Sequence, residues 1–148
     1  GLVAHELGHV VHFSWREGGG QKLGSGPWWQ LYEEGFAQYC EQQIMGDESW
    51  HMRAFNRGED WLAWCTENKA WLASEYLRAV EEAESVRLFF GSWYHLRGHK
   101  QTGYFLGHET IDNLAHSMAL TDIALLDEGE ALAQVMRRVL NEFAAGTS

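Results

Sequence analysis

Two histidines near the start of the sequence have a spacing that suits a shared metal ion. They belong to the segment HELGH, residues 5–9. On a helix, positions four apart lie on one face, so the imidazoles of His5 and His9 can reach a single ion. Neutral imidazole nitrogens suit tetrahedral Zn²⁺, with bonds of about 2.0–2.1 Å. Glu6 projects roughly 100° around the helix from His5, beside the ion but outside its coordination shell. From there Glu6 can act as a general base toward a metal-bound water.

The residues around this segment predict a buried helix. Apolar side chains precede it at positions 2–4 and follow it at positions 10–11, so we expect a mostly buried helix from Leu2 to about Ser14. Two histidines and a glutamate inside such a helix are costly unless something pairs with them, and a metal ion would do so. Hydrogen-bonded core histidines are the alternative. His12 shares the face of His5 and His9, and we expect it to support the site or line its cleft.

A catalytic zinc site takes three protein ligands and a water, so one more ligand is required. Zinc sites that continue with a glycine and a third histidine are excluded, because His12 and Trp15 occupy those positions. A second helix, predicted from Trp28 to Met45 with Gly46 as its C-terminal stop, offers Glu33 and Glu34. Adjacent helical residues point about 100° apart, so only one of the two can face the metal. A glycine-rich loop, residues 18–26, separates the two helices.

The second helix carries a family resemblance. Its segment EEGFAQY, residues 33–39, resembles the "EG-apolar-Ala-x-Tyr" signature of gluzincin peptidases such as the aminopeptidase and glycyl-aminopeptidase groups. In that signature the Glu directly before Gly is the zinc ligand, which implies Glu34 here. The glycine, Gly35, implies a close approach of two helices. Glu34 follows His9 by 25 residues, a longer separation than is usual in these enzymes, and no GxMEN-type exopeptidase motif is present.

A second tract bears on the oxyanion that forms during peptide hydrolysis. The segment TGYFLG, residues 102–107, resembles a "GYxxG" element of predicted bacterial zinc-dependent proteases of unknown substrate. Hydrolysis needs a donor for the developing negative charge, and the candidates are Tyr104, His99 and His108. Tyr104 is preferred, because the glycines around it would bring its helix close to the metal. A core aromatic is the alternative role for Tyr104.

The remaining pattern is helical, and it predicts an all-α fold for this chain. Leu88 to Phe90 can be helix or strand, since so short an apolar run does not decide. Further helices are expected from Asp47 to about Asn56, from Glu59 to Ser85 with a break near Asn68, from Gly103 to Met118 capped by Thr102, and from a capping box at Asp127 and Glu130 to about Ala145. We interpret residues 1–148 as one domain, the helical C-terminal portion of a zincin-like fold, with strands expected upstream of Gly1.

Composition narrows the classes of partner. With 148 residues, 45% apolar, the chain can fold around one core. Its net charge of −10 disfavours nucleic acid and anionic membranes as partners, and no apolar run is long enough to span a bilayer. Cys40 and Cys65 are expected to be buried free thiols, with a single bridge left open. No signal peptide is visible, but the first residues already have the pattern of a helix interior, so the compartment stays open and the cytoplasm is only slightly favoured. Nothing in the sequence sets the oligomeric state.

These observations predict zinc-dependent hydrolysis of peptide bonds in a peptide or protein substrate. His5, His9 and Glu34 would hold Zn²⁺, and Glu6 would be the base. Two alternatives remain: a catalytically silent, zinc-supported binding or regulatory domain, and a zinc hydrolase of a non-peptide amide. The presence of Glu6 favours catalysis, because a purely structural zinc site has no use for a base beside the metal.

Overall fold

The computed structural model describes residues 1–53 and 57–147, and this part of the chain is helical without a strand. Only Leu96 and His99 form an isolated bridge. The predicted all-α class is therefore confirmed. The helices are α1 (Leu2–Gly18), α2 (Gly26–Met45), the 3₁₀ turn η1 (Gly46–Glu48), α3 (Trp50–Arg53), α4 (Trp61–Glu67), α5 (Lys69–Glu81), α6 (Arg87–Phe90), α7 (Thr102–Ala115), α8 (Leu120–Ala124) and α9 (Glu130–Ala144).

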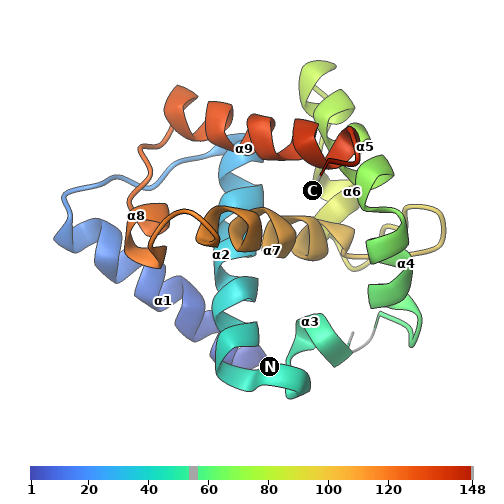
Figure 1. Cartoon of the computed structure of the whole chain (residues 1–148), viewed down its shortest axis with the longest axis horizontal. Coiled ribbons are helices and arrows are strands. Elements are labelled where there is room, and N and C mark those ends of the chain that lie inside the picture. The colour runs from blue at the N-terminus through green and yellow to red at the C-terminus, as the bar shows by residue number, and fades with distance from the viewer. Residues whose placement is uncertain (54–56, 148) are drawn as a thin grey trace.

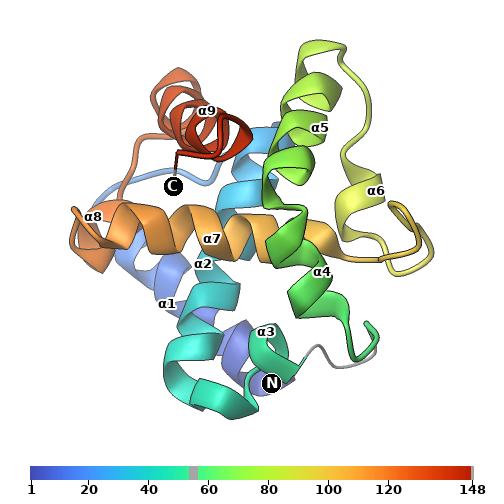
Figure 2. The same cartoon turned by 45° about the vertical axis from the view of Figure 1, so that its right-hand side comes forward.

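Helix α2 is the centre of the arrangement. Helix α1 packs along it, and α7 crosses it (Figure 1). Helix α5 lies against α9, and α4 continues from α5 toward the α3 end of the molecule (Figure 2). The core contains apolar side chains from α2, α4, α5, α7 and α9. Helices α1 and α7, which are far apart in the sequence, thus both pack on α2.

Glycines allow these close crossings. A Cβ atom added to Gly8 of α1 would lie 2.8 Å from the Cα atom of Ala37 in α2. A Cβ atom added to Gly107 of α7 would lie 2.7 Å from the Cα atom of Gly35 in α2. Side chains at these positions would force the backbones apart. The close approach of two helices implied for Gly35 is therefore present, and α7 is its partner.

Helix α1 differs from the predicted mostly buried helix. Leu2, Val3, Leu7 and Val10 are 57%, 73%, 49% and 59% exposed, respectively. The buried face, which turns toward α2, carries Ala4, His5, Gly8, His12 and Arg16. The prediction that these apolar residues are buried was wrong, because among the described elements α1 packs mainly on one helix, α2. Three polar residues of this helix, His5, His12 and Arg16, lie inside, and most of its apolar residues lie outside.

Arg16 fastens the end of α1 to the rest of the molecule. The residue is fully buried. Its Nη1 donates to the carbonyl oxygens of Ala124 at 2.9 Å and Leu126 at 2.7 Å, and its Nε donates to that of Lys22 at 2.9 Å. Its Nη2 also pairs with Glu128 at 3.2 Å. A buried guanidinium with this many acceptors holds α1, the following loop and the segment after α8 in one arrangement.

Several predicted boundaries agree with the structure. The long segment breaks at Asn68, which separates α4 from α5, and Gly46 ends α2 with a positive φ of 56°. The undecided run Leu88–Phe90 is helical, within α6. The region from Asp47 onward forms η1 and α3 in place of one helix, and the predicted end of that helix at Asn56 lies outside the described residues.

Two predicted caps are wrong. Helix α9 begins after Gly129, whose φ of 91° turns the chain, and neither Asp127 nor Glu130 makes a side-chain cap. At the start of α7, Gln101 is the N-cap residue and Thr102 is already the first helical one. In both places the helix begins where the backbone turns, and no side chain caps its first residues. Helix α8 was not predicted.

Both cysteines are buried free thiols, as expected. Burial raises the pKa of Cys40 to about 11, and the pKa of Cys65 is raised to about 12, also by burial. None of the described helices combines the length and the apolar character that crossing a membrane requires.

Candidate metal and catalytic site

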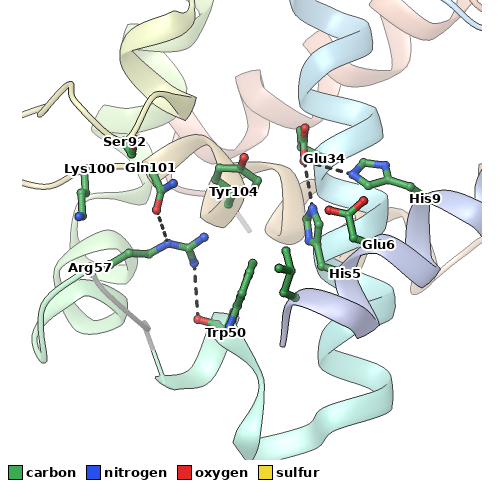
Figure 3. Close-up of a pocket in the computed structure, with 11 residues that line it drawn as sticks. His5, Glu6, His9, Glu34, Trp50, Arg57, Ser92, Lys100, Gln101 and Tyr104 are labelled. Carbon is green, nitrogen blue, oxygen red and sulfur yellow. Dashed lines mark hydrogen bonds and ion pairs between the residues drawn. The ribbon is translucent and has the colours of Figure 1, made fainter.

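His5 and His9 of α1 meet Glu34 of α2 at the crossing of these two helices. The Oε2 atom of Glu34 lies 3.2 Å from His5 Nε2 and 3.5 Å from His9 Nε2. One ligand atom from each residue lies within 4.8 Å of the other two. Figure 3 shows the three side chains pointing toward one another. The structure thus brings together the three residues predicted to bind a metal.

The spacing of these atoms fits a tetrahedral ion. Bonds of about 2.0–2.1 Å at tetrahedral angles place neighbouring ligand atoms about 3.3–3.4 Å apart. The two distances from Glu34 Oε2 lie on either side of this value. The Nδ1 atoms of His5 and His9 are buried and have no hydrogen-bond partner among the described residues. The hydrogen bonding of both rings is therefore directed toward the shared carboxylate through Nε2. A set of two imidazole nitrogens and one carboxylate is a common zinc ligand set.

The ionisation of Glu34 also suits a metal ligand. Burial favours its neutral form, but hydrogen bonds with His5 and His9 outweigh burial and lower its pKa to about 2. Burial lowers the pKa of His9, but its hydrogen bond with Glu34 and the negative charges of Glu34, Glu33 and Glu6 raise it overall. Glu34 is thus a carboxylate at neutral pH, the form that binds metals.

Glu33, the rival ligand, is turned aside. Its Oε1 lies 3.9 Å from Nδ1 of His9, which is too long for a hydrogen bond. Burial raises the pKa of Glu33, while a hydrogen bond with Trp29 opposes the shift. Of the two adjacent glutamates, Glu34 is the one within reach of both histidines.

Glu6 stands beside this triad without a structural partner. Its side chain lines the same cavity, and Figure 3 shows its carboxylate next to His5, His9 and Glu34. The residue is exposed, and it forms no hydrogen bond or ion pair with a described residue. A carboxylate in this position is free to accept a proton from a water molecule in the cavity.

The cavity has a volume of about 330 Å³. The triad and Glu6 line one part of it, and a second wall comes from α3, the segment after it and the segment before α7. This second wall consists mainly of Trp50, Arg57, Ser92, Lys100 and Gln101. Sequence reasoning missed these residues. No spacing pattern in the sequence indicates these residues, because they come from short helices and loops that only tertiary packing brings to the site.

Tyr104 of α7 also lines the cavity. Its ring lies 5.9 Å from that of His5, measured between centroids. Burial and the negative charges of Glu34 and Glu6 raise its pKa to about 12, although Arg57 opposes the shift. The hydroxyl therefore keeps its proton at neutral pH. It forms no hydrogen bond with a described residue, so it can donate one to a group in the cavity.

The other two candidates for the oxyanion donor lie elsewhere. His99 stacks on Trp64, with ring centroids 4.0 Å apart, and its Nε2 lies 3.1 Å from Asp60 Oδ2. His108 is buried and stacks on His51, 3.6 Å between centroids. Neither histidine lines the cavity that contains the triad.

His12 is a core residue. Its Nε2 donates to the hydroxyl oxygen of Tyr32 at 3.0 Å, and its ring stacks on Phe36. Burial lowers its pKa to about 3, with a contribution from the positive charge of Arg16, so the ring is neutral. The expectation that His12 supports a ligand or lines the cleft is wrong, because the ring turns into the core below the site.

A second group, His51, His108 and Glu109, also has ligand atoms within 4.8 Å of one another. The two imidazole rings lie at 19° to each other with centroids 3.6 Å apart. The lone pair of an imidazole nitrogen lies in the plane of its ring. Nearly parallel stacked rings therefore direct their lone pairs side by side and do not converge on one ion. We assign no metal to this group.

Comparison with models of known protein families gives no match, and comparisons with curated proteins and with solved structures give none either.

Proposed function

We propose that this chain hydrolyses peptide bonds with a zinc ion held by His5, His9 and Glu34. The observation that carries the proposal is the position of Glu34 Oε2, which lies 3.2 and 3.5 Å from two imidazole nitrogens, with Glu6 unpaired beside them. A bound zinc ion would supply a Lewis acid that acidifies water and polarises a carbonyl oxygen. The ligand set and its spacing support zinc over harder cations, which prefer oxygen ligands alone.

The chain's own residues would perform the proton transfers. Glu6 accepts a proton from the attacking water and passes it to the leaving amine. Tyr104, whose hydroxyl remains protonated at neutral pH, donates a hydrogen bond to the oxyanion. A catalytically silent domain is the weaker alternative, since a purely structural zinc site has no use for the carboxylate of Glu6 in the cavity beside the triad.

The test compares a base with a ligand in the full-length protein. Glu6→Gln keeps the size of the side chain but removes its basicity. We expect this variant to retain about one zinc per chain, while hydrolysis of a mixed peptide library falls by roughly 10²- to 10⁴-fold. His5→Ala should lose zinc and activity together. Zinc is measured by elemental analysis and hydrolysis by mass spectrometry of the products.

Two results would contradict the proposal. A parent protein that binds no zinc, and whose melting temperature does not change with a chelator, would remove the metal site. A fully zinc-loaded parent that cleaves no peptide would favour the silent domain.

A further inference from the structure

Arg57 is a buried cation in the wall of the cavity, on the side away from the triad. The residue is only 8% exposed, and it lines the same cavity as His5 and Glu34. Figure 3 shows its guanidinium pointing toward the space bounded by Tyr104, Trp50 and His5.

The contacts of Arg57 hold the guanidinium in place without neutralising it. Its Nε donates to Gln101 Oε1 at 3.1 Å, and its Nη1 approaches the carbonyl oxygen of Trp50 at 3.5 Å. The group lies 4.6 Å from the ring centroid of Trp61 and 5.1 Å from that of Tyr104. These partners are neutral. No carboxylate of a described residue lies within 4.0 Å of it.

A buried cation without a paired anion is costly. Burial lowers the pKa of Arg57 to about 10, and the more distant charge of Glu41 only partly opposes this effect. Oε1 of Glu41 accepts a hydrogen bond from the backbone N–H of Trp50 at 2.9 Å, and Oε2 is buried without a hydrogen-bond partner among the described residues, but the carboxylate forms no ion pair with Arg57. A ligand that brought an anion into the cavity would therefore supply the counter-charge that the described residues do not.

The geometry of the cavity says where such an anion would lie. Arg57 and Lys100 line the side of the cavity opposite the triad, away from the carboxylates of Glu6 and Glu34. A guanidinium offers a planar fork that matches a carboxylate. In a protein with a net charge of −10, two cations in one wall of this cavity mark a local site for anions.

We propose that Arg57 binds a carboxylate of the substrate, so that the site prefers peptides with an anionic group close to the bond being cleaved. This inference rests on the proposed hydrolysis for the identity of the ligand as a peptide, and it adds the substrate class. The carboxylate can be the C-terminus of the peptide or an Asp or Glu side chain. An anion held at Arg57 would also orient the peptide across the triad in one direction.

The test measures binding and cleavage separately, on the full-length zinc-loaded protein. Two pairs of short peptides distinguish the sources of the carboxylate: a free C-terminal acid against its amide, and a Glu-containing peptide against its Gln counterpart. Dissociation constants are measured by calorimetry with Glu6→Gln as background, and kcat/KM with the parent. We expect at least one anionic peptide to be favoured over its neutral partner by roughly 10- to 100-fold in both measurements.

Variants then assign this preference to Arg57. Arg57→Gln should reduce the ratio between the acid and its neutral partner to about 1. Arg57→Lys keeps the charge but loses the paired N–H donors of the planar guanidinium, so it should keep part of the preference. Arg53→Gln is the control, since Arg53 is an exposed arginine that pairs with Glu48 outside the cavity. It should leave the preference unchanged.

The outcomes separate this inference from the hydrolase proposal. If anionic peptides bind more tightly in a way that depends on Arg57, but no peptide is cleaved, the carboxylate site would be supported. The same result would contradict the hydrolase proposal. The carboxylate site would be overturned if no peptide binds, if acids and neutral partners bind equally, or if Arg57→Gln keeps the preference. It would also be overturned if Arg57→Gln lowers kcat/KM equally for both members of a pair, which is the behaviour of an oxyanion donor.

Discussion

Glu33 and Glu34 are adjacent in the sequence but occupy different environments, because a helix turns about 100° between neighbours. Glu34 reaches both ligand histidines and is ionised, whereas burial raises the pKa of Glu33, which lies 3.9 Å from His9 Nδ1. Glu34 is therefore placed to share in the proposed ligand set, whereas Glu33 can only influence the orientation or charge of His9.

This difference predicts unequal losses of zinc affinity. Glu34→Ala removes a ligand and should weaken zinc binding by far more than Glu33→Ala, which should lower it by roughly tenfold at most. Competition with a chelating dye measures both affinities. Circular dichroism of each variant provides the control for folding. Equal losses, or a larger loss for Glu33→Ala, would show that the ligand has been assigned to the wrong glutamate.

Much of the candidate site was predictable residue by residue. The spacing of His5 and His9 within one helix fixes their common face, and the resemblance around Glu34 identified the carboxylate that lies beside them. Arg57 was not predictable. It reaches the cavity only because Trp61 and Gln101, from two other segments, hold its guanidinium. Local sequence contains no periodic signal for such a contact.

At the scale of elements, the position of Tyr104 depends on how closely α7 approaches α2. The crossing is made at Gly35 and Gly107, where backbone touches backbone. A Cβ atom on Gly107 would lie 2.7 Å from Gly35 Cα and 2.8 Å from the carbonyl oxygen of Leu31. All of these neighbours are main-chain atoms, so rotation of a side chain cannot relieve the overlap.

We therefore expect Gly107→Ala to lower the free energy of unfolding by about 1–3 kcal/mol, because α7 must move away from α2. Gly18→Ala is the matched control. Gly18 is also helical, but an added Cβ there meets nothing within 4 Å. Its replacement should be neutral or stabilise the fold by up to about 1 kcal/mol. Urea unfolding measures both variants. A Gly107→Ala variant with the same free energy of unfolding as the parent would mean that the crossing is not as close as described.

The positions of most helices could be predicted from the sequence, whereas the packing around each helix could not. Apolar periodicity and Gly46 located α2, and Asn68 marked the break between α4 and α5. The exposure of Leu7 and Val10 could not be foreseen, since a pattern of apolar residues does not state how many neighbours a helix has. Asp127 and Glu130 have capping spacing, yet the positive φ of Gly129 sets the start of α9.

At the scale of the whole molecule, burial holds two histidines, His12 and His51, in their neutral form. The pKa of His12 is lowered to about 3, and burial lowers that of His51 to about 2, with further contributions from the neighbouring His108 and Arg57. An unfolded histidine has a pKa near 6.5. Between these values the unfolded chain binds protons that the folded chain excludes. Stability therefore falls as the pH drops below about 6.5 and is unaffected by these groups above it.

His51 allows this linkage to be isolated. Its Nδ1 is buried with no hydrogen-bond partner among the described residues, and its ring stacks on Phe105 and His108. His51→Phe keeps an aromatic ring in this stack and removes the titrating group. We expect a change of at most about 1 kcal/mol at pH 7. Between pH 7 and pH 5, however, the parent should lose about 2 kcal/mol more than the variant, at about 1.4 kcal/mol per pH unit below 6.5.

The measurement is urea unfolding at both pH values in the presence of a chelator, so that loss of metal does not contribute. His12 remains in both proteins and gives them a common slope, which cancels in the difference. Glu109 lies 3.8 Å from Nε2 of His51 and would favour a charged ring. If that carboxylate outweighed burial, His51 would be protonated in the fold, and the parent would lose no more stability on acidification than His51→Phe. Equal slopes would thus show that the interior at α3 and α7 tolerates a charged imidazole.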